Sequence, residues 1–120
     1  MIEFEEYKGK LNGLKPTLDA LRDALHLEAA EKEIEELEGQ SARDGFWNDV
    51  ENSQRVQKRL KQLKAKVENY EKLCSGWDDL MTLCEMAIEE DDDSMLPELQ
   101  SEYAEFEKKL EETRLGTLLT

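Results

Sequence analysis

Residues 56–88 read VQKRLKQLKAKVENYEKLCSGWDDLMTLCEMAI, and this stretch decides the fold. Its apolar residues alternate in steps of four and three, the spacing of a helix packed along its length against other helices. These positions are Val56, Leu60, Leu63, Val67, Tyr70, Cys74, Trp77, Met81, Cys84 and Ile88. Flanking residues extend the helix over about residues 48–90, a length of roughly 63 Å at a rise of about 1.5 Å per residue. We therefore expect one long central helix on which shorter helices pack.

The composition agrees with a helical protein. Of the 120 residues 38% are hydrophobic and 38% are charged, and the chain has only 6 Gly and 2 Pro, a profile typical of helical and coiled-coil chains. We expect an all-α fold, an elongated antiparallel helical bundle of coiled-coil hairpins built on the long central helix, in a single domain over residues 1–120. No apolar run approaches the roughly 20 residues of a membrane span, and the acidic N-terminus does not resemble a signal peptide. We therefore expect a cytoplasmic protein without membrane contact.

Three shorter helices are predicted beside the long one. The first covers about residues 3–25 and is expected to be kinked near Pro16, because proline removes a backbone hydrogen bond and clashes with the preceding turn; two separate helices are the alternative. Its apolar positions are Phe4, Tyr7, Leu11, Leu14, Leu18, Leu21 and Leu25. The second helix covers about 28–38, with Ile34 and Leu37 as its apolar anchors, and the last covers about 95–114. The apolar positions of the last helix are Leu96, Leu99, Tyr103, Phe106, Leu110 and Thr113.

The junction before the long helix carries two aromatic residues. Residues 39–45 read GQSARDG, which predicts a loop. Phe46 and Trp47 follow, with Asn48 or Asp49 as the cap of the long helix. We expect both aromatic side chains to close the hairpin onto the core. The alternative is a protein-docking hot spot, in which tryptophan is enriched.

The long helix is expected to stop at five carboxylates, residues 89–93, since negative charge opposes the dipole at a helix C-terminus. Asp93 or Ser94 is expected to cap the last helix, Pro97 suits its first turn, and Gly116 is expected to end it. An EF-hand loop counted from Asp91 would place Met95 and Leu96 at a ligand and a glycine position, so the calcium pattern fails.

No residues with catalytic or metal-binding spacing stand out. His26 is the only histidine, and Cys74 and Cys84 lie about 15 Å apart along one helix, too far for a disulfide. We interpret both cysteines as core residues in a reducing compartment. The sequence therefore predicts a protein that is not an enzyme, with no catalytic, cofactor-binding or metal residues and with partner-binding residues unknown.

The charge distribution bears on partners. Sixteen basic and thirty acidic residues give a formal charge of −14, a field that repels phosphate. One segment is basic and free of acids, with Arg55, Lys58, Arg59, Lys61, Lys64 and Lys66. One hypothesis is a local RNA contact. We favour pairing within the chain, with the glutamates of residues 28–38 folded back beside this segment.

Three stretches resemble a known family in their order and spacing. They are LRDALHLEAAEKEIEELE at 21–38, DGFWND at 44–49 and LCEMAIEEDDDSMLPEL at 83–99. Over essentially all 120 residues the chain resembles the N-terminal domain of the bacterial peptide chain release factor 2 family, which belongs to the class I release factors. The sister factor 1 family has a similar helical start but lacks the Trp junction.

The resemblance implies a role in translation termination. Full-length members read stop codons on the ribosome with a Ser-Pro-Phe tripeptide and trigger peptidyl-tRNA hydrolysis with a Gly-Gly-Gln loop. Neither tripeptide occurs here, so the codon-reading and Gly-Gly-Gln domains are expected beyond Thr120. The resemblance implies partners for this domain: the ribosome near the stalk base and the GTPase release factor 3, with no sequence-specific nucleic acid bound directly.

A second hypothesis is a free-standing cytoplasmic coiled-coil adaptor or helical-hairpin chaperone. Self-association would distinguish it, because the release-factor domain is expected to be monomeric or weakly dimeric.

Overall fold

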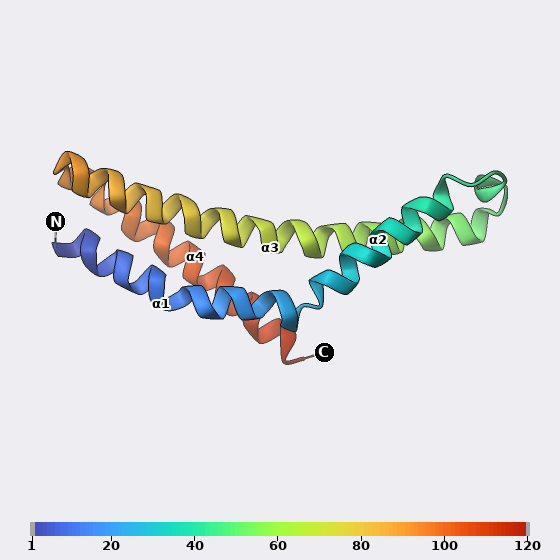
Figure 1. Cartoon of the computed structure of the whole chain (residues 1–120), viewed down its shortest axis with the longest axis horizontal. Helices are drawn as coiled ribbons and strands as arrows, with labels where there is room; N and C mark the ends of the chain where they lie inside the picture. The colour runs from blue at the N-terminus through green and yellow to red at the C-terminus, as the bar shows by residue number, and fades with distance from the viewer. Residues whose placement is uncertain (1, 120) are drawn as a thin grey trace. The chain divides into compact units, whose positions relative to one another are not determined.

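The computed structural model describes residues 2–119 and is built from helices (Figure 1). The four α-helices are α1 (Ile2–Ala24), α2 (Leu27–Ser41), α3 (Val50–Glu90) and α4 (Leu96–Thr117), with two 3-10 turns, η1 (Phe46–Asn48) and η2 (Asp93–Met95). No strand occurs within these described residues. The predicted all-α fold with one long helix is confirmed.

The chain divides into two compact units that share α3. Unit 1 comprises the described parts of residues 1–21 and 71–120, and unit 2 comprises residues 22–70. Unit 1 therefore holds α1 up to Leu21, α4 and the second half of α3, while unit 2 holds residues 22–24 of α1, α2, η1 and the first half of α3. The expected single domain over 1–120 stays a prediction, and each unit is described by itself.

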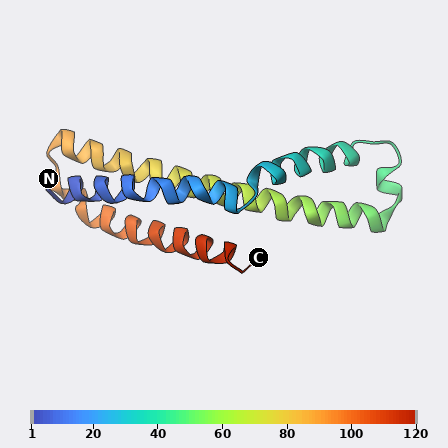
Figure 2. The same cartoon turned by 60° about the horizontal axis from the view of Figure 1, so that its bottom comes forward.

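Unit 1 is a three-helix assembly in which α1 and α4 both run antiparallel to α3 (Figure 2). Its helices meet pairwise. The indole N–H of Trp77 in α3 donates to the backbone carbonyl of Leu11 in α1 at 2.7 Å. The rings of Tyr7 and Tyr103 join α1 to α4 edge to face, with centroids 5.1 Å apart.

α3 and α4 pack against each other at Gly76. A Cβ at this position would meet the Phe106 ring at 3.4 Å, an ordinary van der Waals distance, so the ring lies next to the α3 backbone there. Phe106 is itself buried. Because the second half of α3 contacts both α1 and α4, it is buried over a broad face.

That broad face shifts the core register of α3 in unit 1. The predicted stripe is only half-buried at Cys74, Trp77, Met81 and Ile88. Fully buried positions are Leu73, Leu80, Cys84 and Ala87, of which sequence analysis identified only Cys84. A helix that packs against two neighbours buries two adjacent stripes, and an a/d pattern follows only one of them.

Unit 2 is a helical hairpin with a single seam. One apolar cluster joins α2, η1 and α3, and its buried residues are Ala30, Leu37, Phe46, Val56, Leu60 and Leu63, with Ile34 and Val67 packed against it. Here the predicted seam is confirmed, because α3 meets one partner helix. Two further buried residues were not predicted: Ala30, and Ser53, whose hydroxyl donates to the Val50 carbonyl at 2.9 Å.

The helix boundaries differ modestly from those expected. α1 is one helix with Pro16 inside it, so the two-helix alternative is wrong, and the kink near Pro16 stays a prediction. α2 continues to Ser41 rather than 38, because Gly39 keeps ordinary helical geometry. The turn comes at Gly45, whose φ of 83° favours glycine.

Two non-glycine residues with positive φ make the remaining corners. His26 (φ 56°) joins α1 to α2, and Asp91 (φ 51°) follows α3. The N–H groups of Asp91 and Asp92 donate to the carbonyls of Ile88 and Ala87 at 3.2 and 3.0 Å. These two bonds form a Schellman motif, so backbone geometry ends α3.

The last helix begins and ends differently from the prediction. Asp92 rather than Asp93 or Ser94 is the capping side chain, and it caps η2, while α4 has no side-chain cap. Pro97 lies in the first turn of α4, as expected. Gly116 lies within the last turn, since α4 runs to Thr117.

Candidate contact surfaces

The three residues with the most reactive side chains do not form a centre. His26 is exposed in unit 2, Cys84 is buried in unit 1, and Cys74 is half-buried there. Burial raises the pKa of the Cys84 thiol, which keeps it protonated and unreactive. Within residues 2–119, no group of three or more His, Cys, Asp or Glu side chains could hold a metal ion.

The acidic segment after α3 serves the turn. Asp92 Oδ1 accepts from the Ser94 backbone N–H at 2.9 Å, and the hydrogen bonds from Ser94 lower the pKa of this carboxyl. Its neighbour Asp91 takes the left-handed position of the corner. Both residues are therefore occupied with local structure.

An open groove lies between α1 and α4 in unit 1. It has a volume of about 470 Å³, and its lining includes Leu14, Leu110, Glu107, Lys108 and Arg114. Arg114 forms two hydrogen bonds with Glu111 at 2.6 and 2.9 Å on the same helix. The hydrogen bonds from Arg114 lower the pKa of Glu111. The Glu111 carboxylate is thus already paired with a cation.

The two aromatic residues of η1 separate. Phe46 is 8% exposed and belongs to the apolar cluster of unit 2, whereas Trp47 is 61% exposed. Their rings lie edge to face with centroids 4.9 Å apart. The prediction that both close the hairpin is right for Phe46 and wrong for Trp47, because a three-residue turn directs successive side chains to different sides.

Trp47 has an apolar neighbour in sequence at the start of α3. Val50 is also 61% exposed, and the intervening Asp49 caps the helix by accepting from the Asn52 N–H at 3.1 Å. The cap fixes the turn that carries Trp47. An exposed tryptophan three residues before an exposed valine is the kind of feature that protein partners cover.

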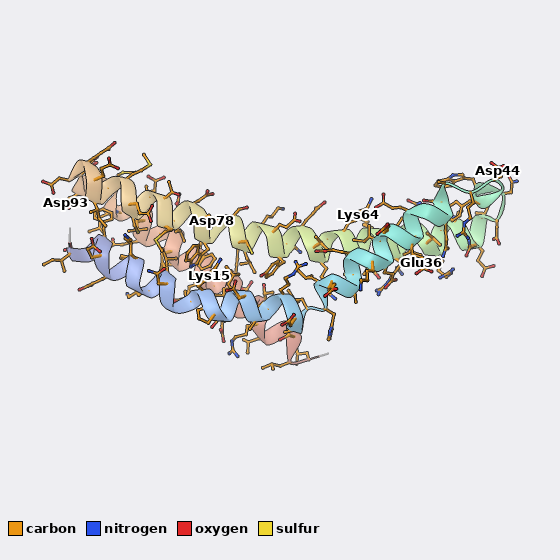
Figure 3. The ribbon with its side chains drawn as sticks, in the orientation of Figure 1. Lys15, Glu36, Asp44, Lys64, Asp78 and Asp93 are labelled. Carbon is orange, nitrogen blue, oxygen red and sulfur yellow. The ribbon has the colours of Figure 1, made fainter. Side chains whose placement is uncertain are left out.

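The basic segment of α3 is partly neutralised by α2, as predicted. Arg59 forms two hydrogen bonds with the Glu33 carboxylate at 2.7 and 2.9 Å, and Lys64 lies 3.9 Å from Glu38. Figure 3 labels Lys64 on α3, in the part of the helix that α2 accompanies. The hydrogen bond from Arg59 lowers the pKa of Glu33, and the charge of Lys66 adds to this. These three cations therefore serve the α2–α3 pair.

No helix among residues 2–119 is both long enough and apolar enough to cross a membrane. The described surface includes the exposed side chains of Trp47 and Val50 and the basic segment of α3. Such surfaces suit contact with other macromolecules.

Comparison with known proteins assigns the family. The PCRF domain family matches residues 30–120. Peptide chain release factor 2 of Acidothermus cellulolyticus is 37% identical over 110 residues, which cover 92% of this chain and 30% of that protein. The proteins of the same name from Petrotoga mobilis and Clostridium perfringens are 30% and 32% identical over 120 residues, and these cover 32% and 33% of their lengths. This chain thus spans about a third of the length of the curated relatives it matches. The family match covers residues 30–120, and the relatives aligned along the chain share one name. This chain therefore belongs to the PCRF-domain family of peptide chain release factors.

Proposed function

We propose that this chain is the N-terminal, non-catalytic domain of a cytoplasmic translation termination factor and that it acts as a contact module. The complete factor would read stop codons on the ribosome and trigger peptidyl-tRNA hydrolysis. The family match over residues 30–120 carries the proposal. The chain spans about a third of the length of its relatives. This fraction supports the interpretation of the chain as one module of a larger factor.

The proposed partners are the ribosome, near its stalk base, and the GTPase release factor 3. The tip of unit 2 supports a protein-facing role, since Trp47 and Val50 are each 61% exposed. Tryptophan supplies a large rigid contact area and is enriched among residues that dominate interface energy.

Co-sedimentation with bacterial ribosomes tests the proposal. The chain is expected to pellet with ribosomes and to release no peptide from a terminating complex above background. Failure to bind ribosomes overturns the contact role, and release at the rate of a full-length factor overturns the non-catalytic role.

A matched pair of variants assigns the surface. Trp47→Ala is expected to weaken ribosome or release factor 3 binding, because it removes the exposed anchor of η1. Met86→Ala removes an exposed apolar side chain in unit 1 and is expected to leave both affinities unchanged. Equal affinities of both variants and the parent chain would exclude the Trp47 tip as the contact.

A free-standing adaptor or helical-hairpin chaperone is the second candidate. The exposed Trp47 is the observation that favours it, because an apolar tip also suits self-association. Sedimentation velocity at micromolar concentration separates the two functions: a stable dimer favours the adaptor, and a monomer favours the release-factor domain.

A further inference from the structure

Three basic residues of α3 do not pair with the glutamates of α2. Between Glu51 and Glu68 the helix carries six basic residues and no acid. Arg59, Lys64 and Lys66 act on Glu33 and Glu38, as described above. The remaining three, Arg55, Lys58 and Lys61, are exposed, and we call them the cation ridge.

Among residues 2–119, no ion pair joins the cation ridge to a carboxylate. The Arg55 guanidinium donates to the neutral Asn52 side chain at 2.8 Å, and none of the ion pairs between described residues involves Lys58 or Lys61. The nearest acids along the helix are Glu51 and Glu68, which leave an acid-free length of about 25 Å. In a chain of formal charge −14, this local excess of positive charge is out of keeping with the rest.

Helix geometry places the ridge on the side of α3 away from α2. At about 100° per residue, Lys58 lies roughly 200° around the helix from Val56, which is buried in the seam with α2. The neighbouring outward positions are the uncharged Gln54, Gln62 and Ala65, all exposed. Between residues 52 and 67 this face thus offers three cations spaced over about 9 Å, amide donors and no carboxylate, and Glu51 lies one turn before Arg55.

We propose that the cation ridge binds phosphate groups of structured RNA, and, given the proposed function, that this RNA is ribosomal. Lysine and arginine contacts to phosphate hold a protein in position without reading sequence. The Gln54 and Gln62 amides can donate further hydrogen bonds to phosphate oxygens. The acidic remainder of the chain keeps RNA off other surfaces, so phosphate contact is confined to this face.

The experiment compares two triple variants with the same change in net charge. The ridge variant is Arg55→Gln, Lys58→Gln and Lys61→Gln. The control variant, Lys72→Gln, Lys108→Gln and Lys109→Gln, removes three exposed cations of unit 1. Circular dichroism checks that each variant keeps its helices, as expected for exposed glutamines. Binding to bacterial ribosomes and to deproteinised large-subunit ribosomal RNA is measured between 50 and 200 mM salt.

The ridge variant is expected to lose roughly tenfold or more in affinity for both probes. The slope of log K against log salt should fall by about 2 to 3, since each lost phosphate contact removes about 0.7 to 0.9 from it. The control variant should match the parent chain. A photo-crosslinking amino acid at Gln62 should yield RNA adducts on the ribosome.

Other outcomes separate the inference from the proposed function. Ribosome binding with unchanged affinity and salt slope in the ridge variant overturns the RNA inference and leaves the contact role intact. Loss of ribosome binding with crosslinks to a ribosomal protein, and no affinity for the bare RNA, shows an acidic protein partner and also overturns it. RNA binding through the ridge without ribosome binding supports the inference and defeats the proposed function.

Discussion

At the residue scale, one aspartate adopts the left-handed helical backbone conformation, which non-glycine residues rarely adopt. Asp91 holds a φ of 51° at the corner after α3, where helices usually place glycine. Its Cβ strains the backbone, and its carboxylate lies at the negative end of the helix dipole. The Schellman hydrogen bonds of Asp91 and Asp92 hold this conformation.

Replacing Asp91 with glycine is therefore expected to stabilise the chain by about 0.5–1 kcal/mol, since the gain at positive φ exceeds the entropy cost of glycine in the unfolded chain. Urea unfolding followed by circular dichroism measures the change. The Asp91→Ala variant removes the charge but keeps a Cβ, so it should be less stable than the glycine variant. If the Asp91→Gly variant has a lower free energy of unfolding than the parent chain, the explanation is wrong.

Tyr103 predicts a specific dependence on alkaline pH. Its side chain is buried between α4 and α1, and burial, followed by the nearby Glu107 carboxylate, raises the pKa of Tyr103 to about 12. An unfolded tyrosine titrates at about 10. The unfolded chain therefore ionises first, so stability present below pH 10 is lost as the pH rises towards 12.

The Tyr103→Phe variant removes this titration. Its stability should decline less steeply than that of the parent chain between pH 10 and about 12, with a difference of up to about 1.4 kcal/mol per pH unit. Parallel urea unfolding series at closely spaced pH values give the two slopes. Identical slopes would show that Tyr103 does not titrate differently in the folded state.

At the element scale, the short turn η1 divides its two aromatic side chains between stability and contact. Phe46→Ala is expected to cost about 3 kcal/mol, because it empties a site in the apolar cluster of unit 2. Trp47→Ala should cost less than about 1 kcal/mol, since its ring is mostly in solvent. Thermal or urea unfolding compares the two variants, and similar losses would contradict the assignment.

The two halves of α3 differ in how much of their packing the sequence alone predicts. The seam at Val56, Leu60 and Leu63 was predictable because one helix covers α3 there. Leu73 and Leu80 were missed, because a sequence does not reveal that two helices cover the other half. Trp47 was misassigned for a related reason: the 3-10 turn that separates it from Phe46 has no periodicity to read. Pairing of the basic segment with the α2 glutamates was predicted from charge, but which cations pair depends on helix register, so Lys58 and Lys61 were not distinguished from Arg59 and Lys64.

At the scale of the whole molecule, one helix belongs to two units of different build. In unit 1 the α3 residues Leu80, Cys84 and Ala87 are buried, and both α1 and α4 contact this half of α3. In unit 2 the residues Val56, Leu60 and Leu63 are buried by one helix and a short turn. Local stability follows the apolar contacts that opening would break, so the backbone of a continuous helix need not be equally stable along its length.

We therefore expect amide hydrogen exchange to divide α3. Backbone amides over 56–67 should exchange faster than those over 77–87, since opening unit 2 exposes the smaller apolar cluster. Leu60→Ala and Leu80→Ala form a matched pair on this helix, each removing one buried leucine. The first should accelerate exchange mainly over residues 22–70, and the second mainly over 2–21 and 71–119, because each leaves a cavity in its own unit. Uniform acceleration along the chain by both variants would instead show that the two units open together, and a region 56–67 as protected as 77–87 would show that one covering helix stabilises α3 as well as two.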